Sequence, residues 1–298
     1  MDRDNLARER DNLFDELWAD PATRILPIFQ GSALLSSDSS LALLPVHAVP
    51  AGELKVYLGR SLSTSSPEPV GTPVVAVQLD DAGHFAEAEW GSLRTLGNVL
   101  SDRDAGMLVE ALGVLNWHAS HRFSPRTGEP TVSEKGGWVR RDPVSNTEVF
   151  PRTDAAIIVG ITDADDRILL GSNALWESNR YSLLAGFVEP GESLETAVQR
   201  EVFEESGIRV IDPVYLGSQP WPFPASLMLG FAARVDPAHG TQATPDGTEI
   251  LDLRWFTRDA LTTALGGANG PEIRLPGRTS IARAIIEQWY GAPIMDGQ

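Results

Sequence analysis

Three glutamates in the C-terminal half, Glu201, Glu204 and Glu205, have the type and spacing to hold a divalent cation. Glu201 and Glu205 are four residues apart, so on a helix they lie above one another on one face, with Glu204 alongside. Carboxylates this close repel each other, and a purely structural helix gains nothing from that repulsion. Mg²⁺ and Mn²⁺ prefer oxygen ligands, which this cluster supplies. A solvated acidic face is the alternative interpretation, and the surrounding pattern decides between the two.

A helix over residues 193–206 is predicted to carry these glutamates. A Pro-Gly turn at 190–191 precedes Ser193, and acidic residues in a first turn suit the helix dipole. Gly207 stands where a left-handed C-terminal cap belongs. The face expected to pack on a sheet is an apolar stripe formed by Leu194, Ala197, Val198 and Val202.

The whole stretch resembles the Nudix box, the signature of the Nudix hydrolases. Its fixed positions are filled, in order, by Gly186, Glu192, Arg200, Glu201, an aliphatic residue at Val202, Glu204, Glu205, Gly207 and an aliphatic residue at Ile208. Because every position of the box is intact, the resemblance implies an active enzyme.

The resemblance also implies a role for each charged residue. Nudix proteins typically hydrolyse a nucleoside diphosphate linked to another group, by attack of water on phosphorus. Glu201 and Glu205 are expected to be the main ligands of a catalytic Mg²⁺ or Mn²⁺. Glu204 is expected to be an auxiliary ligand or base, Arg200 to orient the carboxylates, and Glu192 to brace the loop. Bridging cations neutralise a pyrophosphate and acidify a bound water, and a carboxylate can take the remaining proton.

A second motif follows the helix, the segment Ser218-Gln219-Pro220-Trp221-Pro222-Phe223-Pro224-Ala225-Ser226. Its prolines fix the backbone and present two aromatic rings, a platform on which a flat base can stack for about 1–3 kcal/mol. Taken alone, a proline-stiffened loop that caps the core is the better interpretation. The segment, however, resembles the SQPWPFPxS signature found downstream of the Nudix box in NADH pyrophosphatases.

That family cleaves NADH to NMNH and AMP, and its members also remove NAD caps from RNA 5′ ends. The resemblance implies substrate contacts by Phe187, Gln219, Trp221 and Ser226. It also implies that Phe150 stacks on the nucleotide from the partner subunit of a homodimer. The resemblance spans roughly residues 118 to 290, and the N-terminal domain matches the family only in size and placement.

Two later segments fit the same family. Glu249 matches its additional metal-binding glutamate, for which a surface loop acid is the alternative interpretation. Residues 275–282 match the family's C-terminal pattern and are expected to shape the pocket and to start the last helix.

Composition limits the class of protein further. The chain of 298 residues contains no cysteine, which excludes disulfides, thiolate zinc ligands and a cysteine nucleophile. A formal net charge of −17 argues against DNA binding and against general binding to a nucleic-acid backbone. The sequence shows no signal peptide and no apolar run of membrane-spanning length, so a soluble cytoplasmic protein with no membrane contact is expected.

The periodicity predicts an α+β protein in two domains, of which the N-terminal one is β-rich. The resemblance implies that the C-terminal domain has the Nudix fold, a mixed sheet between helices. We expect the N-terminal domain at 1–117, with a helical segment at 1–20, a mostly antiparallel set of strands from 25 to 100 and a helix at 102–117. A connector follows at 118–152, and the Nudix domain occupies 153–298. Its expected strands are 155–161, paired with 167–170, then 210–216, 227–235 and 251–256, and its closing helix is 280–290.

The connector departs from the family. Most relatives carry a four-cysteine zinc ribbon here, whereas Ser124, Thr127, Asp142 and Ser145 stand at the cysteine positions. These side chains make a poor tetrahedral zinc site, so no structural zinc is expected. Packing of Phe123 and Trp138 together with hydrogen bonds is expected to hold the connector, or it is partly mobile. His118 and His121 are interpreted as ordinary surface residues.

Two other functions remain open. One is a Nudix hydrolase of ADP-ribose or dinucleoside polyphosphates, against which the proline-rich aromatic signature argues. The other is a non-catalytic Nudix-fold sensor that binds NAD or ADP-ribose. Such a sensor is expected to have lost box glutamates and gained a DNA-binding module, and neither feature is visible.

Overall fold

The computed structural model describes residues 1–50, 52, 54–177, 179–266 and 271–295. The chain divides into two compact units. The first consists of residues Met1–Thr153 together with the short segment Trp221–Ala225, and the second of Asp154–Pro220 and Ser226–Gln298. Five residues from the middle of the C-terminal half therefore belong to the first unit.

The first unit is built on a sheet whose main strand order is β3-β2-β1-β6-β5, with β4 paired to β1 and β7 to β2. Its strands are β1 (Arg24–Phe29), β2 (Ser32–Ser37), β3 (Ser40–Leu41), β4 (Leu44–Pro45), β5 (Leu54–Arg60), β6 (Pro73–Gln78) and β7 (Trp90–Ser92). Strands β1 and β6 run parallel and the other pairs antiparallel, which confirms the mostly antiparallel arrangement expected. Strand β4 is short and ends at Pro45. Pro45 has no N–H to donate to a ladder, and the chain turns into a short helix after it.

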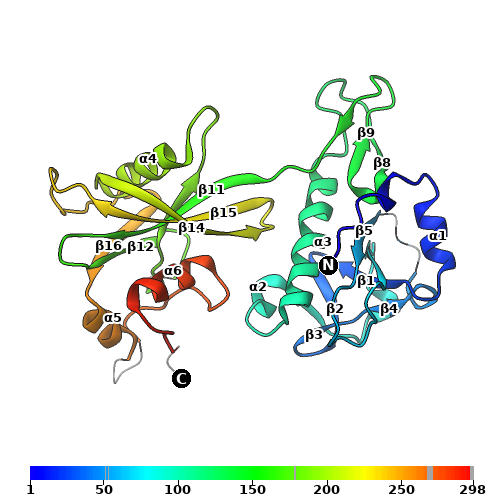
Figure 1. The fold of residues 1–298 in the computed structure, drawn as a ribbon, viewed down its shortest axis with the longest axis horizontal. Helices are drawn as coiled ribbons and strands as arrows, with labels where there is room; N and C mark the ends of the chain where they lie inside the picture. Colours follow the sequence, from blue (N-terminus) through cyan, green and yellow to red (C-terminus); the bar gives the residue numbers. More distant parts are fainter. Residues whose placement is uncertain (51, 53, 178, 267–270, 296–298) are drawn as a thin grey trace. The chain divides into compact units, whose positions relative to one another are not determined.

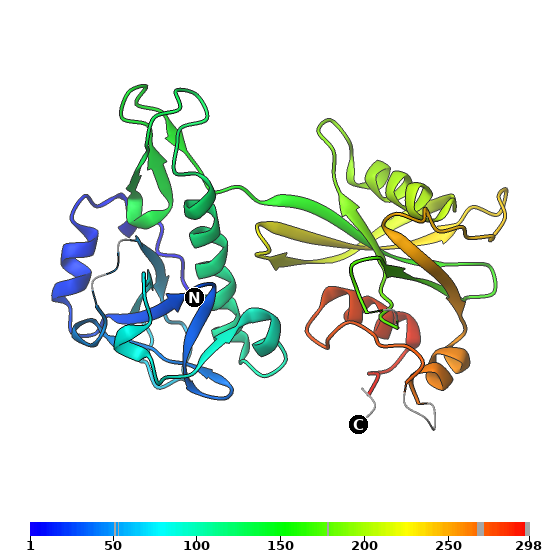
Figure 2. The ribbon, with the colours of Figure 1, turned by 180° about the vertical axis from the view of Figure 1, so that it is seen from behind.

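Helices frame this sheet. They are η1 (Ala7–Glu9), α1 (Leu13–Ala19), η2 (Val46–Ala48), η3 (Gly83–Phe85), α2 (Leu93–Leu96) and α3 (Asp102–Ser120). In α3, which lies along one side of the sheet in Figure 2, the Ser101 side chain accepts the N–H of Asp104 as an N-cap. Its inner face buries Met107, Leu108, Ala111 and Leu115 in the main core of the first unit. The helix continues to Ser120, three residues beyond its expected end.

The extra turn of α3 buries His118, so the interpretation of this histidine as a surface residue is wrong. Its Nε2 lies 2.8 Å from the carbonyl oxygen of Gly137, and its Nδ1 lies 2.7 Å from Nη1 of Arg140. Burial lowers the pKa of His118 to about 4. A neutral ring that donates from Nε2 and accepts from Arg140 satisfies both contacts. His118 thus joins α3 to the connector.

The connector folds into a three-stranded sheet of order β10-β9-β8. Its elements are β8 (Val132–Glu134), η4 (Lys135–Gly137), β9 (Val139–Arg141) and β10 (Glu148–Val149). Trp138 packs as expected, because its Nε1 donates to the carbonyl of Tyr57 at 2.8 Å and the Arg8 guanidinium lies 3.9 Å from its ring centroid. Phe123 is 60% exposed, so the packing expected of it is wrong.

The four residues at the cysteine positions of the relatives meet in a hydrogen-bonded cluster centred on Asp142. Oδ2 of Asp142 accepts the hydroxyls of Thr127 at 2.8 Å and Ser145 at 2.7 Å, and Oδ1 accepts the backbone N–H of Ser145 at 3.2 Å. Ser124 caps the facing turn by accepting the N–H of Thr127 at 3.3 Å. The hydroxyls of Ser124, Ser145 and Thr127 hold the pKa of Asp142 well below its usual value. A buried carboxylate therefore links the two turns of the connector.

The second unit is a mixed sheet of main order β14-β15-β11-β12-β16, with β13 also paired to β11. Its strands are β11 (Asp154–Thr162), β12 (Ile168–Asn173), β13 (Leu184–Phe187), β14 (Val210–Trp221), β15 (Ser226–Val235) and β16 (Ile250–Phe256). Its helices are α4 (Leu194–Ser206), α5 (Arg258–Leu265) and α6 (Ile281–Tyr290). Strands β11 and β15 run parallel, and the hairpin expected between β11 and β12 is confirmed. Strand β14 extends to Trp221, five residues beyond the strand expected, while β13 and α5 were not expected.

Helices α4 and α6 cover opposite faces of this sheet (Figures 1 and 2). Ala197, Val198 and Val202 of α4 are fully buried in one core, and Ile285 and Ile286 of α6 belong to another. The predicted apolar stripe of α4 is therefore confirmed, as are its predicted start, where Ser193 is the N-cap, and its left-handed cap at Gly207.

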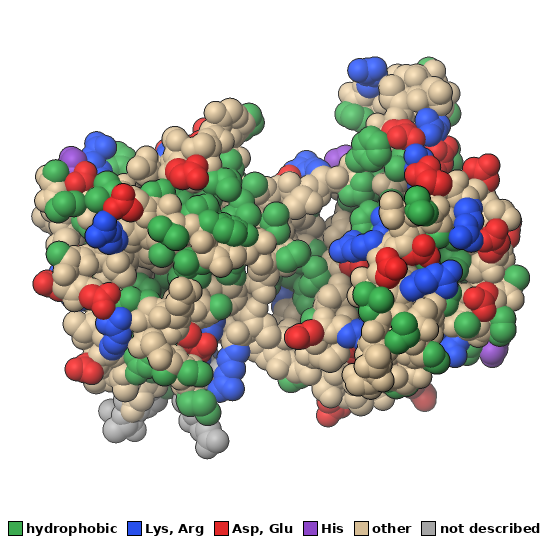
Figure 3. All heavy atoms as spheres, in the orientation of Figure 1, with side chains coloured by type: hydrophobic (Ala, Val, Ile, Leu, Met, Phe, Trp, Pro, Cys, Tyr) green, Lys and Arg blue, Asp and Glu red, His purple; other side chains and the backbone are tan. Residues whose placement is uncertain are grey.

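Acidic side chains are spread over the visible face of both units and alternate with arginines and lysines (Figure 3). Within the described residues, no helix has the length and apolar character needed to cross a membrane.

Candidate functional site

Gly186 and Glu201 meet between strand β13 and helix α4. Gly186 lies opposite Ile157 in the antiparallel β11–β13 ladder. A Cβ atom built on Gly186 would lie 2.0 Å from Cδ of Glu201 and 2.1 and 2.2 Å from its carboxylate oxygens. The Glu201 carboxylate therefore fills the space that a side chain at position 186 would need. The first glycine of the box and its first helical acid form one contact.

Arg200 links the acids around it into one network. Its Nε and Nη2 donate to the two carboxylate oxygens of Glu192 at 2.8 and 2.9 Å. Its Nη1 lies 2.9 Å from Oε1 of Glu201 and donates to Oε2 of Glu204 at 2.9 Å. Glu192 also accepts the backbone N–H of Glu189 at 3.1 Å, so it braces the loop before the helix, as expected. A planar guanidinium suits this arrangement because it offers several donors in a fixed geometry.

Glu205 is the buried acid of the cluster. It is 6% exposed, and its Oε2 has no hydrogen-bond partner among the described residues. Burial, together with the charges of Glu249, Glu201 and Asp246, raises the pKa of Glu205 to about 8. Burial is also the main cause that raises the pKa of Glu201. A buried carboxylate beside other acids is unfavourable unless a proton or a cation neutralises it.

Glu249 lies on the turn that leads into β16, and Asp246 holds this turn. Asp246 accepts the backbone N–H groups of Glu249 at 3.1 Å and Ile250 at 2.7 Å and the hydroxyl of Thr248 at 2.6 Å. These bonds, led by that of Thr248, lower the pKa of Asp246 to about 2. On the other side, the N–H of Ala174 donates to the carbonyl of Glu249 at 2.8 Å. The backbone on both sides of Glu249 is thereby fixed.

The sequence reasoning missed Asp246. The available signal was its place before Gly247 and Thr248, because an aspartate in such a turn commonly accepts N–H groups two to four residues ahead.

The aromatic segment Trp221–Ala225 belongs to the first unit. The ring centroids of Trp221 and Phe223 are 5.0 Å apart in an edge-on arrangement. The Arg94 guanidinium, from α2, lies 3.9 Å from the centroid of Phe223. Phe223 also packs against the core of this unit, so the alternative interpretation of a core-capping ring applies to it.

Asn116 of α3 fixes the backbone of the same segment. Its Nδ2 donates to the carbonyl oxygen of Pro222 at 2.9 Å and to that of Pro224 at 3.3 Å. A proline-rich segment has few N–H groups, so its carbonyls need outside donors. No sequence motif pointed to Asn116 or Arg94.

The remaining expected substrate contacts lie in different surroundings. Phe187, at the end of β13, is 56% exposed, and its carbonyl accepts a hydrogen bond from Arg200 at 2.9 Å. Ser226 is buried at the start of β15, opposite Asp154 of β11. Phe150 is 59% exposed and belongs to the first unit.

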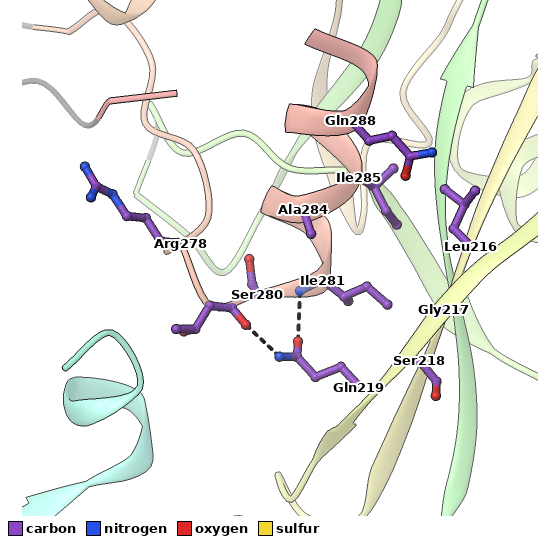
Figure 4. A pocket seen from close by; sticks show the side chains of 11 residues that line it. Leu216, Gly217, Ser218, Gln219, Arg278, Ser280, Ile281, Ala284, Ile285 and Gln288 are labelled. Atoms are coloured by element: carbon purple, nitrogen blue, oxygen red, sulfur yellow. Dashed lines mark hydrogen bonds between the residues drawn. The ribbon is translucent and has the colours of Figure 1, made fainter. Parts of the chain in front are cut away.

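Gln219 has both ends of its side-chain amide bound within the second unit. Its Nε2 donates to the carbonyl of Thr279 at 2.6 Å, and its Oε1 accepts the N–H of Ile281 at 2.8 Å (Figure 4). These contacts join the end of β14 to the start of α6.

The acids of α4 and of the turn before β16 suit a hard cation by two observations. All the donors are carboxylate oxygens, and the buried Oε2 of Glu205 has no hydrogen-bond partner among the described residues. Within that part of the chain, no three acidic or histidine side chains already converge on one point as a ligand set. The residues fit a divalent cation by chemistry and burial, without a closed arrangement of ligands.

Comparison with known proteins identifies the family of each unit. Residues 151–274 match the NUDIX domain, and residues 22–117 match the NADH pyrophosphatase-like rudimentary NUDIX domain. An NAD-capped RNA hydrolase NudC from Mycobacterium bovis is 46% identical over 277 residues, which cover 87% of this chain and 86% of that protein. The chain belongs to the NudC family of Nudix hydrolases. The expectation that the N-terminal domain matches the family only in size and placement is therefore wrong.

The NudC family relationship extends to other organisms. The NudC of Mycobacterium tuberculosis is also 46% identical over 277 residues. The human NAD-capped RNA hydrolase NUDT12 is 37% identical over 200 residues, which cover 64% of this chain and 42% of that protein. Nudix hydrolases typically use divalent metals, in keeping with the oxygen donors gathered here.

Proposed function

We propose that this chain hydrolyses the pyrophosphate bond of NADH or NAD, giving NMNH or NMN and AMP, and that it removes NAD caps from RNA 5′ ends by the same reaction. The observation that carries the proposal is the acid cluster of α4, in which Arg200 binds Glu201 and Glu204 while Glu205 keeps a buried oxygen without a hydrogen-bond partner among the described residues. The names of the relatives, NAD-capped RNA hydrolases, support the choice of substrate.

The chain's own residues divide the chemistry among them. Glu201, Glu205 and Glu249, with Glu204 as an auxiliary, would hold Mg²⁺ or Mn²⁺. When bound, such a cation neutralises phosphate charge and makes water more acidic. Arg200 keeps Glu201 and Glu204 in place through its contacts with both. Glu204 is 56% exposed at its side chain and is the acid suited to take a proton from the attacking water.

The balance of the reaction needs no further reagent. One water adds across the P–O–P bridge, its oxygen joins one phosphorus, and the bridging oxygen leaves on the other. Both products are monophosphates, and the proton released goes to a carboxylate and then to solvent. The absence of cysteine is compatible with this direct displacement.

Substrate recognition is assigned to the residues that the family resemblance named. Phe187 and Trp221 present aromatic surface for a base or a nicotinamide ring, and Ser226 offers a hydroxyl. Stacking of this kind contributes about 1–3 kcal/mol per ring. Phe150 is assigned to the neighbouring subunit's site in a homodimer. The net charge of −17 favours recognition of the capped 5′ end over the RNA backbone.

A cytoplasmic location completes the proposal. The three-part division into 1–117, 118–152 and 153–298 is retained as a proposal for the folding units of the enzyme.

The test is product analysis with several substrates. The protein is incubated with NADH, NAD, an NAD-capped RNA, ADP-ribose or a dinucleoside polyphosphate, each with Mg²⁺ or Mn²⁺, and the products are separated by chromatography. Formation of NMNH and AMP at a kcat/KM above that for ADP-ribose supports the proposal. Faster cleavage of ADP-ribose or of the dinucleoside polyphosphate contradicts it. Binding of NAD without turnover under every metal condition identifies the sensor instead.

A further inference from the structure

Gln219 occupies a position that joins two parts of the second unit. Its side chain leaves β14 and reaches the turn before α6, where it bonds Thr279 on one side and Ile281 on the other (Figure 4). One amide therefore brackets Ser280, which is the N-cap of α6. The oxygen and the nitrogen of the amide both bond to backbone groups, as a peptide group of a neighbouring strand does.

The bond to Ile281 satisfies a group that the helix itself leaves unpaired. The first N–H groups of a helix have no partner within the helix. The Ser280 hydroxyl oxygen accepts one of them, the N–H of Arg283 at 3.2 Å, and Gln219 accepts that of Ile281. Two side chains thus cap the start of α6: Ser280 from the preceding turn and Gln219 from β14.

The body of α6 lies close to the sheet because glycines face it. A Cβ at Gly230 of β15 would lie 2.8 Å from Cδ1 of Ile281 and 2.9 Å from Cδ1 of Ile285. A Cβ at Gly160 of β11 would lie 2.8 Å from Cγ2 of Ile285. The helix is therefore fixed over β11 and β15, and Gln219 fixes its first turn to the edge strand β14.

A cavity of about 300 Å³ lies between β14 and α6. One wall is β14 from Leu216 to Gln219, and the other is α6, with Ile281, Ala284 and Gln288. Figure 4 shows Gln219 crossing from one wall to the other at the end nearest Ser280. Loss of its two bonds would free this end of the cavity and the residues on both sides of it.

We propose that Gln219 is a positioning residue: its amide holds the turn Thr279–Ile281 against β14 and thereby fixes the start of the segment that carries Trp221 and Ser226. This assignment rests on the proposed function and changes the expected role of Gln219 from substrate contact to support. The catalytic glutamates lie on α4, across the sheet from α6, so the support acts on substrate binding and not on the hydrolytic step.

Two variants separate the bonds. Gln219→Ala removes both, while Gln219→Glu keeps the acceptor for Ile281 and places a second oxygen opposite the carbonyl of Thr279. Gln288→Ala, on the far wall of the same cavity, is the matched control. Loss of one or two hydrogen bonds predicts a KM for NADH raised roughly five- to tenfold in Gln219→Ala, with kcat within about twofold of the parent. The KM of Gln219→Glu is expected to lie between those of the parent and Gln219→Ala, and Gln288→Ala keeps the parent KM.

Hydrogen exchange of the amides of residues 279–284 is measured on the same proteins without substrate. The proposal predicts faster exchange there in Gln219→Ala, unchanged exchange in α4, and no change in Gln288→Ala. Unchanged exchange in Gln219→Ala overturns the proposal, whether or not KM rises. Faster exchange with an unchanged KM also overturns it. If the parent does not hydrolyse NADH, the proposed function fails by itself, while the exchange result still reports on the two bonds.

Discussion

The carboxylate of Glu201 occupies the space beside Gly186 that any other residue would fill with its Cβ atom, at 2.0 Å from the glutamate's Cδ. The contact ties the position of a proposed metal ligand to the absence of a side chain on β13. It explains in physical terms why a glycine stands six residues before Glu192 and fifteen before the acid it accommodates.

Gly186→Ala is expected to displace the Glu201 carboxylate. Because that group is the far end of a flexible side chain, the protein should keep its fold and lose only about 1 kcal/mol of stability, or less, while kcat falls by at least tenfold. The measurements are kcat for NADH and a thermal melt. Gly113→Ala is the control, since nothing lies within 4 Å of a Cβ there. Alanine also has a higher helix propensity than glycine, so this change should not destabilise α3. Full activity of Gly186→Ala would mean that activity does not depend on the position of the Glu201 carboxylate, which would contradict the prediction.

Glu205→Gln is expected to lower the hydrolytic activity and to raise the stability of the metal-free protein. Burial and neighbouring acids raise the pKa of Glu205 from 4.5 to about 8. A folded-state pKa above the unfolded value gives stability that is complete below pH 4.5 and is lost as pH rises through 8. The metal-free parent should therefore melt progressively lower between pH 5 and pH 9, and Glu205→Gln should depend on pH less.

The same variant tests metal binding. Mg²⁺ or Mn²⁺ should raise the melting temperature of the parent most strongly at alkaline pH, where Glu205 would otherwise carry an uncompensated charge. Glu205→Gln should lose most of that increase and all detectable hydrolysis. Glu195→Gln, exposed in the first turn of the same helix, is the control and should behave like the parent. Hydrolysis at the parent rate in Glu205→Gln would refute the assigned ligand.

His118 is expected to make the first unit sensitive to acid. Burial lowers its pKa from 6.5 to about 4, so the stability that depends on the neutral ring is complete above pH 6.5 and is lost as pH falls towards 4. A shift of this size corresponds to about 3 kcal/mol. In His118→Gln, whose amide nitrogen can still donate to the carbonyl of Gly137, this part of the pH dependence should disappear. Denaturant melts at pH 7.5, 6 and 5 measure the effect, with His121→Gln, at a half-buried histidine, as the control.

Asp142→Ala is expected to loosen the connector. The substitution leaves the hydroxyls of Thr127 and Ser145 without their acceptor, and the two turns lose their link. Thermal unfolding should shift down by several degrees, with faster hydrogen exchange at residues 124–128 and 142–147. Asp165→Ala, a strongly exposed turn acid in the second unit, is the control. If a zinc-selective chelator lowered the melting temperature of the parent, a cluster held by hydrogen bonds would be contradicted.

Local periodicity was sufficient for helix α4, which carries the acids of the site, but it did not predict β13, which carries Gly186. The apolar stripe of α4, its serine N-cap and its glycine C-cap are encoded by neighbours in the chain, and the structure agrees with the prediction. The end of α3 was predicted too early. Trp117 was the last large apolar residue of the pattern, and nothing local indicates that His118 pairs with Arg140 of β9. Likewise, β14 extends beyond its predicted end because it pairs with β15, and Pro220 near its end argued against a strand there.

The sequence by itself determined which residues are available for chemistry: a complete box of acids, an arginine among them, a proline-rich aromatic segment and no cysteine. Tertiary structure alone decided their relations. The fit of Glu201 beside Gly186, the cluster around Asp142, the amide of Gln219 between β14 and α6, and the place of Trp221–Ala225 in the first unit all join residues distant in the chain. Such contacts follow from the packing of elements against one another, which no local pattern of residue types records.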